Sequence, residues 1–167
     1  MDRLRAFVAP LYQELDGVSR LGEIERIAAI ARGLHPGGDR AFELLLLLHG
    51  LGKWLEKLGN LSRMSLATGV AEKELRDALT SIRRLDDPHT EEERALAAAI
   101  LIDGAGVRGL AERFSRARRE GQSLMDVVRD VLADSWIPDW LPEEARELLE
   151  ERHNARRATC RQILHES

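Results

Sequence analysis

The chain has 167 residues, of which 44% are hydrophobic and 32% are charged. This length can bury one ordinary hydrophobic core and is short for two, so we predict a single domain over residues 1–167. The formal net charge of −4 excludes a global positive field that would attract nucleic acid or anionic lipid. The single cysteine, Cys160, excludes an internal disulfide, and no cysteine/histidine cluster has the spacing of a structural zinc site.

The sequence also predicts where the protein resides. Residues 1–15 mix charged with apolar side chains and lack the unbroken apolar stretch of a signal peptide. The most apolar run, Leu44–Leu48, is far shorter than the roughly 20 residues needed to cross a bilayer. We therefore expect a cytoplasmic protein with no membrane partner, and we expect residues 44–48 to be a buried core segment.

Apolar residues recur at helical spacing along the chain and strand-like alternation is absent, so the pattern predicts an all-α helical bundle. An N-terminal helix is expected over residues 1–18, and a second over 21–34. Asp39 then caps a helix over 41–58, which should end at Gly59. Because the first half of this third helix is apolar on every side, we place it at the centre of the bundle.

The second half of the chain shows equally clear helix boundaries. A stripe over residues 70–85 is followed by Thr90 and Glu93, which form a capping box at the start of a further apolar helix. That helix should break near Gly104–Gly106. Three more helices are expected, over 107–119, 124–132 (capped by Ser123) and from Pro142 to Leu164, with an aromatic loop at 136–140 before the last.

Several motifs together resemble the HD-domain family of metal-dependent phosphohydrolases. Residues 44–53 read Leu-Leu-Leu-Leu-Leu-His-Gly-Leu-Gly-Lys, which is similar to a hydrophobic helix ending in His-Asp-x-Gly-Lys, with Gly50 in place of Asp. Residues 22–27 resemble the first family motif, with Glu23 in place of its His. Residues 94–106 align without gaps on a third motif, with Ala98 in place of the metal-binding Asp, and residues 144–153 resemble the final helix. The resemblance covers residues 21–164; a generic helical bundle rich in Leu, Ala and Arg is the alternative.

The resemblance implies a divalent metal held by a His, a His-Asp pair and a distant Asp. The corresponding positions here are Glu23, His49, Gly50 and Ala98, and glycine and alanine side chains cannot coordinate a metal. A metal that activates water needs several ligand atoms converging on one ion. We therefore expect no metal cofactor; if one binds, His49 and Glu23 are its candidate ligands.

The remaining polar residues of these motifs predict a vestigial pocket formed by Glu23, His49, Lys53 and Asp103. Carboxylates are rarely buried without a partner, so we expect Lys53, Arg83 or Arg84 to pair with them. The same basic side chains form a candidate ligand-binding set for a small phosphate-like anion. The alternative for His49 is a core histidine that hydrogen-bonds to a neighbouring backbone group or carboxylate.

Three functional hypotheses follow. The first is a degenerate HD-domain protein without phosphohydrolase activity, which binds a small phosphate-like ligand or a protein partner in a binding or regulatory role. The second is an active metal-dependent phosphohydrolase that uses Glu23 and His49 with other carboxylates such as Asp103. The third is a structural helical interaction module, such as a homodimer, that associates through an apolar surface around Trp136 and Trp140.

Other patterns are interpreted as structural. The arginines of residues 108–119 and 152–161 alternate with glutamates, which is typical of a solvated helix face, so we expect no nucleic-acid partner. His89 falls in a turn and should be exposed. The glycines at 104, 106 and 109 have dinucleotide-motif spacing, but they follow a helical pattern and not a strand, so we reject that interpretation.

Overall fold

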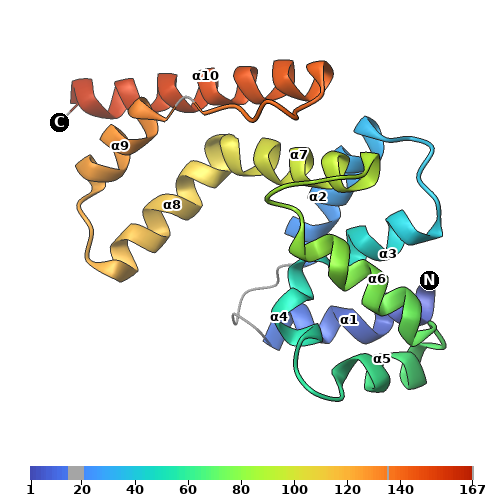
Figure 1. Ribbon diagram of the computed structural model, residues 1–167. Coiled ribbons are helices and arrows are strands. Elements are labelled where there is room, and N and C mark those ends of the chain that lie inside the picture. The colour runs from blue at the N-terminus through green and yellow to red at the C-terminus, as the bar shows by residue number, and fades with distance from the viewer. Residues whose placement is uncertain (15–20, 135, 167) are drawn as a thin grey trace. The chain divides into compact units, whose positions relative to one another are not determined.

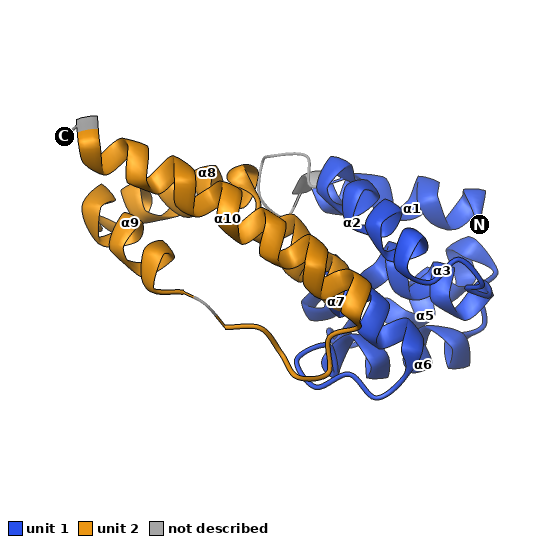
Figure 2. Cartoon of the chain, turned by 90° about the horizontal axis from the view of Figure 1, so that it is seen from above, with its two compact units in different colours: residues 1–97 blue, residues 98–167 orange. Residues whose placement is uncertain are grey.

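The computed structural model describes residues 1–14, 21–134 and 136–166, and all regular secondary structure in these ranges is helical (Figure 1). The all-α prediction is confirmed. Residues 15–18 of the expected N-terminal helix lie outside the described residues. The chain divides into two compact units, residues 1–97 and 98–167 (Figure 2). Each unit has a hydrophobic core cluster of its own, and the single-domain assignment stays a prediction.

The N-terminal unit is built around α3 (Arg40–Leu48). Five of its side chains are buried, and the helix packs against both α2 and α6, as expected for a helix that is apolar all round. The other elements of this unit are α1 (Asp2–Glu14), α2 (Leu21–Leu34), a 3-10 turn η1 (His49–Leu51), α4 (Gly52–Leu55), α5 (Asn60–Thr68), α6 (Glu72–Arg83) and the first part of α7 (Glu91–Ala105).

The expected helix over 41–58 is wrong in its second half. The α-helix ends at Leu48 and continues as η1 and the short α4, and α5 then begins at Asn60, where the sequence predicted only a helix end. Glycines at 50 and 52 have low helix propensity, which weakens the helix at this point. The hydroxyl of Tyr12 donates a hydrogen bond of 2.7 Å to the carbonyl oxygen of Leu47, which satisfies an acceptor at the end of the helix.

The predicted helix caps are confirmed. Asp39 accepts a 3.0 Å hydrogen bond from the backbone N–H of Phe42 at the start of α3. At the start of α7, the hydroxyl of Thr90 accepts from the N–H of Glu93 at 3.2 Å, and the Glu93 carboxylate accepts from the N–H of Thr90 at 3.3 Å. Ser123 accepts from Met125 at 3.2 Å. These short polar side chains therefore set helix starts as local sequence chemistry requires.

The C-terminal unit contains the end of α7 together with α8 (Val107–Glu120), α9 (Leu124–Ala133) and α10 (Glu143–Glu166). The last three helices pack against one another. Their shared core is apolar and includes Cys160, where burial raises the pKa of the thiol. The other buried members of this core are Leu110, Ala117, Val127, Val128 and Val131. No helix in the described part of the chain is both long and apolar enough to cross a membrane.

The helix breaks at Gly106, between α7 and α8, and this break explains the glycine spacing in this segment. A Cβ atom on Gly109 would overlap the backbone carbonyl oxygen of Gly104, so only glycine permits this approach. Gly106 lies between them in extended backbone, at the start of α8. The three glycines therefore let two helices meet closely, which agrees with our rejection of a dinucleotide motif.

Candidate functional site

His49 lies at the break between α3 and η1. Its Nδ1 atom is 2.7 Å from the carbonyl oxygen of Leu46. Because a carbonyl can only accept, Nδ1 carries the proton and Nε2 is an acceptor. Nε2 is buried and has no hydrogen-bond partner among the described residues. Burial lowers the pKa of His49, although the bond to Leu46 opposes this effect, so the ring is neutral at pH 7.

Gly50 lies next to the ring of Tyr12. Side chains of neighbouring residues already occupy the space that a side chain at position 50 would need. A Cβ added to Gly50 would lie 2.8 Å from Cε1 of Tyr12 and 2.9 Å from Cδ1 of Ile24. The aspartate that the HD signature has at this position would therefore clash here. Burial of the Tyr12 hydroxyl, with a smaller contribution from the charge of Glu23, raises the pKa of Tyr12.

This region does not fit the divalent cation that the HD resemblance implies. The space next to His49 where a carboxylate would be needed holds the Tyr12 ring and an isoleucine methyl group. Among residues 1–14, 21–134 and 136–166, no three His, Cys, Asp or Glu side chains form a group that could hold a metal ion. The expectation that the protein uses no metal stays a prediction.

The four residues of the predicted vestigial pocket have different surroundings. Glu23, on α2, is half-buried and close enough to Tyr12 to influence its titration. His49 is enclosed beside Gly50, whereas Lys53 on α4 is exposed. Asp103 is half-buried near the end of α7 and belongs to the C-terminal unit. The pocket itself therefore stays a prediction.

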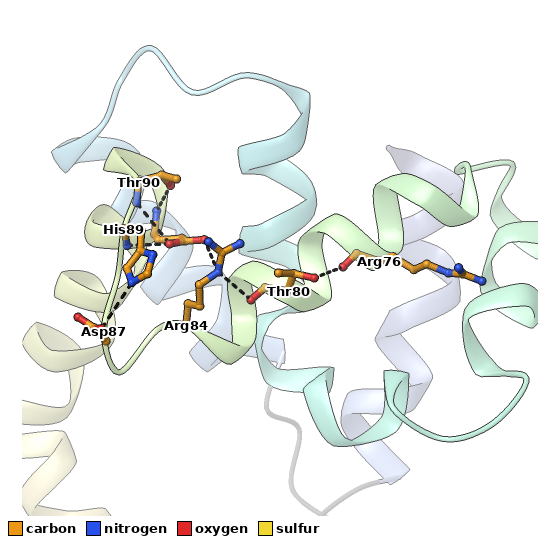
Figure 3. Close-up of polar contacts among 7 residues, drawn as sticks. Arg76, Thr80, Arg84, Asp87, His89 and Thr90 are labelled. Carbon is orange, nitrogen blue, oxygen red and sulfur yellow. Dashed lines mark hydrogen bonds and ion pairs between the residues drawn. The ribbon is translucent and has the colours of Figure 1, made fainter.

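The two arginines predicted to bind a ligand both have acidic partners. Nε of Arg83 donates to Glu56 at 2.9 Å, and this pair is exposed. Nε of Arg84 lies 3.7 Å from the buried carboxylate of Glu93, beside the Thr90 cap (Figure 3). His89 is exposed, as expected, with its Nε2 atom 3.5 Å from Asp87. These contacts explain the basic residues structurally, and their role in ligand binding stays a prediction.

A cavity of about 360 Å³ in the C-terminal unit has a different chemistry. Its walls come from α7, α8, the segment before α10, and α10 itself. We call it the arginine pocket, because three guanidinium groups line it: those of Arg113, Arg116 and Arg156. The rest of the lining consists of Ile100, Leu101, Gly104, Ala105, Gly109, Glu112, Asp134, Trp136, Leu149 and His153.

Asp134 connects two of these arginines. Its Oδ2 atom accepts a 3.2 Å hydrogen bond from Nη2 of Arg156 and lies 3.5 Å from Nη2 of Arg113. Its backbone carbonyl accepts a 2.6 Å hydrogen bond from Arg157. One carboxylate therefore faces two guanidinium groups of the pocket. Glu112, the other acid of the lining, forms an ion pair of 3.6 Å with Arg108 on the same helix, so the pocket carries an excess of positive charge.

Arg156 is the most buried charged side chain of this cluster. Its side chain is 2% exposed, and its Nε atom has no hydrogen-bond partner in the described part of the chain. Burial and the charge of Arg113 lower the pKa of Arg156, while Asp134 raises it. A guanidinium stays protonated at pH 7 despite such shifts. Burial and the neighbouring arginines, Arg156 foremost, also lower the pKa of His153, which is therefore neutral.

The alternation of arginine and glutamate in the sequence predicts a solvated face for these arginines, and for Arg156 this prediction is wrong. The missed signal is the buried stripe of α10, which runs through Ala145, Leu149, His153, Arg156 and Cys160 at helical spacing. Arg156 occupies a core position of that stripe. In the sequence, this appears as an arginine at a position of the helix where the spacing of apolar residues predicts burial, and such an arginine is a candidate pocket residue.

No protein-family model matches this sequence, and no curated protein or solved structure matches it either. The resemblance to the HD-domain family therefore depends on the motifs alone. It stays a prediction, as does the set of site residues that follows from it.

Proposed function

We propose that this protein is a binding protein for a small phosphate-like anion, which it holds in the arginine pocket. The observation that carries the proposal is Arg156, a charged side chain 2% exposed on the wall of a cavity, with an unpartnered N–H. A buried charge is costly unless it is paired and hydrogen-bonded. An oxyanion in the cavity would place a second counter-charge beside this guanidinium.

The charge of the pocket supports the same ligand class. Arg113 and Arg156 share one oxygen of Asp134, and Arg116 adds a third guanidinium to the lining. Planar guanidinium groups match the oxygens of phosphate, and hydrogen bonds to ionised acceptors are the strong ones. Asp134 holds the arginines in place without neutralising them, so an anion gains from the remaining positive charge.

Calorimetric titration of the full chain with inorganic phosphate and pyrophosphate tests this proposal. Arg116→Gln changes an exposed side chain, so it should fold normally and still weaken binding. Loss of a charged hydrogen bond costs about 1.5–3 kcal/mol, or about 10- to 100-fold in Kd. Arg129→Gln is the matched control, because Arg129 is exposed on α9 and pairs with Asp126 outside the pocket. Absence of binding by the wild-type chain, or equal losses in both variants, would overturn the proposal.

We propose further that the fold is a degenerate HD-type bundle without phosphohydrolase activity. The motif order along α2, α3 and α7 supports membership. The fit of Tyr12 against Gly50 gives a physical reason for the lost aspartate. The test is the metal content of protein purified without chelator, with hydrolysis of a generic phosphomonoester in added Mn²⁺, Ni²⁺ or Mg²⁺. Stoichiometric metal, with turnover abolished in His49→Ala, would favour the active-enzyme alternative.

A further inference from the structure

The arginine pocket has an apolar wall that a bare phosphate would not use. This wall consists of three uncharged side chains: Ile100 and Leu101 from α7, and Leu149 from α10. Its volume of about 360 Å³ falls at the lower end of the range of about 300–1,000 Å³ typical of small-molecule sites. The cavity therefore has room and apolar surface for a group attached to the anion.

Trp136 indicates what that group is. Its side chain lines the pocket and is 65% exposed, which is unusual for so large an apolar ring. An exposed indole beside a binding site offers a flat face on which a planar ring can stack. The lining thus combines three guanidinium groups with one aromatic face.

Described residues before and after this tryptophan have fixed surroundings. Asp134 is fixed through its side chain by Arg156 and through its carbonyl oxygen by Arg157. Pro138 and Leu141, which follow Trp136, are buried. The pocket wall next to the ring is therefore ordered before a ligand arrives, and such preorganisation favours binding.

We infer that the ligand of the arginine pocket is a phosphate monoester that carries a planar aromatic ring, with the phosphate on Arg113, Arg116 and Arg156 and the ring on Trp136. This inference rests on the proposed function, because it names the substituent of the proposed anion. The pocket size favours one ring system and one phosphate group. Nucleoside monophosphates and pyridoxal 5′-phosphate are two sources of this shared chemistry.

A comparison of phenyl phosphate with methyl phosphate isolates the ring. Both ligands carry one monoester phosphate, and only the first has a planar ring. We expect the full chain to bind phenyl phosphate roughly fivefold or more tightly, in line with the usual strength of stacking on an aromatic side chain. Trp136→Leu should remove this difference, whereas Trp136→Phe should retain most of it.

The outcomes separate the inference from the proposed function. If neither ester nor pyrophosphate binds, the proposed function itself fails. If both esters bind equally, or if Trp136→Leu weakens both by the same factor, the anion site stands and the ring inference is overturned. Binding of adenosine monophosphate or pyridoxal 5′-phosphate at least as tight as that of phenyl phosphate supports the inference and identifies the ring. Weaker binding of both than of methyl phosphate contradicts it.

Discussion

Each unit of this protein has a buried nitrogen atom without a hydrogen-bond partner in the described residues, but the two atoms differ in charge and surroundings. Nε2 of His49 belongs to a neutral ring whose other nitrogen bonds to Leu46. Nε of Arg156 belongs to a cation on the wall of a cavity. The histidine avoids the cost of burying a charge because it is neutral, whereas the arginine stays charged. An unpartnered buried atom therefore points to a ligand most strongly when its group cannot lose its charge.

The largest loss of stability is expected when a side chain is added to the closely packed region beside His49. Gly50→Asp places a side chain against Tyr12 and Ile24 and adds a carboxylate there. Overpacking together with burial of a polar group should lower the free energy of unfolding by about 3 kcal/mol, measured by urea denaturation.

Gly22→Asp is the control for this variant, because nothing lies within 4 Å of a Cβ added at Gly22. It adds the same charge to the first turn of α2, where an acid is favourable, so stability should stay within about 0.5 kcal/mol of wild type. If Gly50→Asp were as stable as wild type and gained stability with Mn²⁺, the region would be an open metal site and not a closed one.

The second effect concerns the buried cation. Arg156→Gln removes one guanidinium from Asp134, which keeps its contacts with Arg113 and Arg157. Because Asp134 is 31% exposed, the full penalty for breaking a buried pair does not apply, and we expect a loss of about 2 kcal/mol in unfolding free energy.

Ligand-induced stabilisation sharpens this second test. Pyrophosphate should raise the Tm of the wild-type chain by binding the folded state, and it should raise the Tm of Arg156→Gln much less. Arg129→Gln, which breaks an exposed pair, should behave as wild type in both measurements. Equal Tm increases in all three proteins would mean that Arg156 takes no part in binding.

A buried charge with partners in its own unit provides the reference case. Glu93 is buried, and although burial raises its pKa, hydrogen bonds from His89, Ser81 and Thr90 together lower it below its ordinary value of 4.5. The folded state therefore binds fewer protons, so Glu93 stabilises the protein above about pH 4.5. This stabilisation is lost as the pH falls through the lower, folded-state pKa.

Glu93→Gln should cost about 1 kcal/mol at pH 7, as for other helix caps, and should flatten the acid limb of the stability curve below pH 4.5. Urea denaturation at intervals from pH 7 to pH 3 measures both effects. Thr90→Ala, which removes the other half of the capping box, should cost a similar amount at pH 7 without changing the acid limb. Identical acid limbs in wild type and Glu93→Gln would refute the assigned charge.

At pH 7 the smallest titration effect is expected from the neutral histidine, because the ring is then mostly neutral in both the folded and the unfolded chain. Burial lowers the pKa of His49 below its ordinary value of 6.5, so the unfolded chain takes up a proton first as the pH falls. Stability is then complete above pH 6.5 and declines below it, by at most about 1.4 kcal/mol per pH unit for one proton. His49→Gln should reduce this slope between pH 6.5 and 5.

His153→Gln should also reduce the slope, because the pKa of His153 is lowered as well. An unchanged slope in both variants would contradict the conclusion that the two histidines are buried in their neutral form.

Much of the local structure could be predicted from the sequence. The stripe of apolar residues, the caps at Asp39, Thr90 and Ser123, and the break at Gly104–Gly106 correspond to observed helix boundaries. For the end of α3 the sequence offers only a weak local signal, the glycines at 50 and 52, whereas the hydrogen bond from Tyr12 to Leu47 joins residues 35 positions apart. The site residues stay a prediction: motif positions point to His49, whereas Arg156, on the wall of the cavity with excess positive charge, belongs to no motif.

The sequence by itself determined that this chain is helical and where most of its helices start, because periodicity and caps act between residues three or four positions apart. Only the tertiary structure decided that a tyrosine fills the space beside Gly50, and that an arginine among many is buried against Asp134, 22 positions away. Burial and charge balance arise from contacts between helices. They therefore depend on packing, which no local pattern specifies.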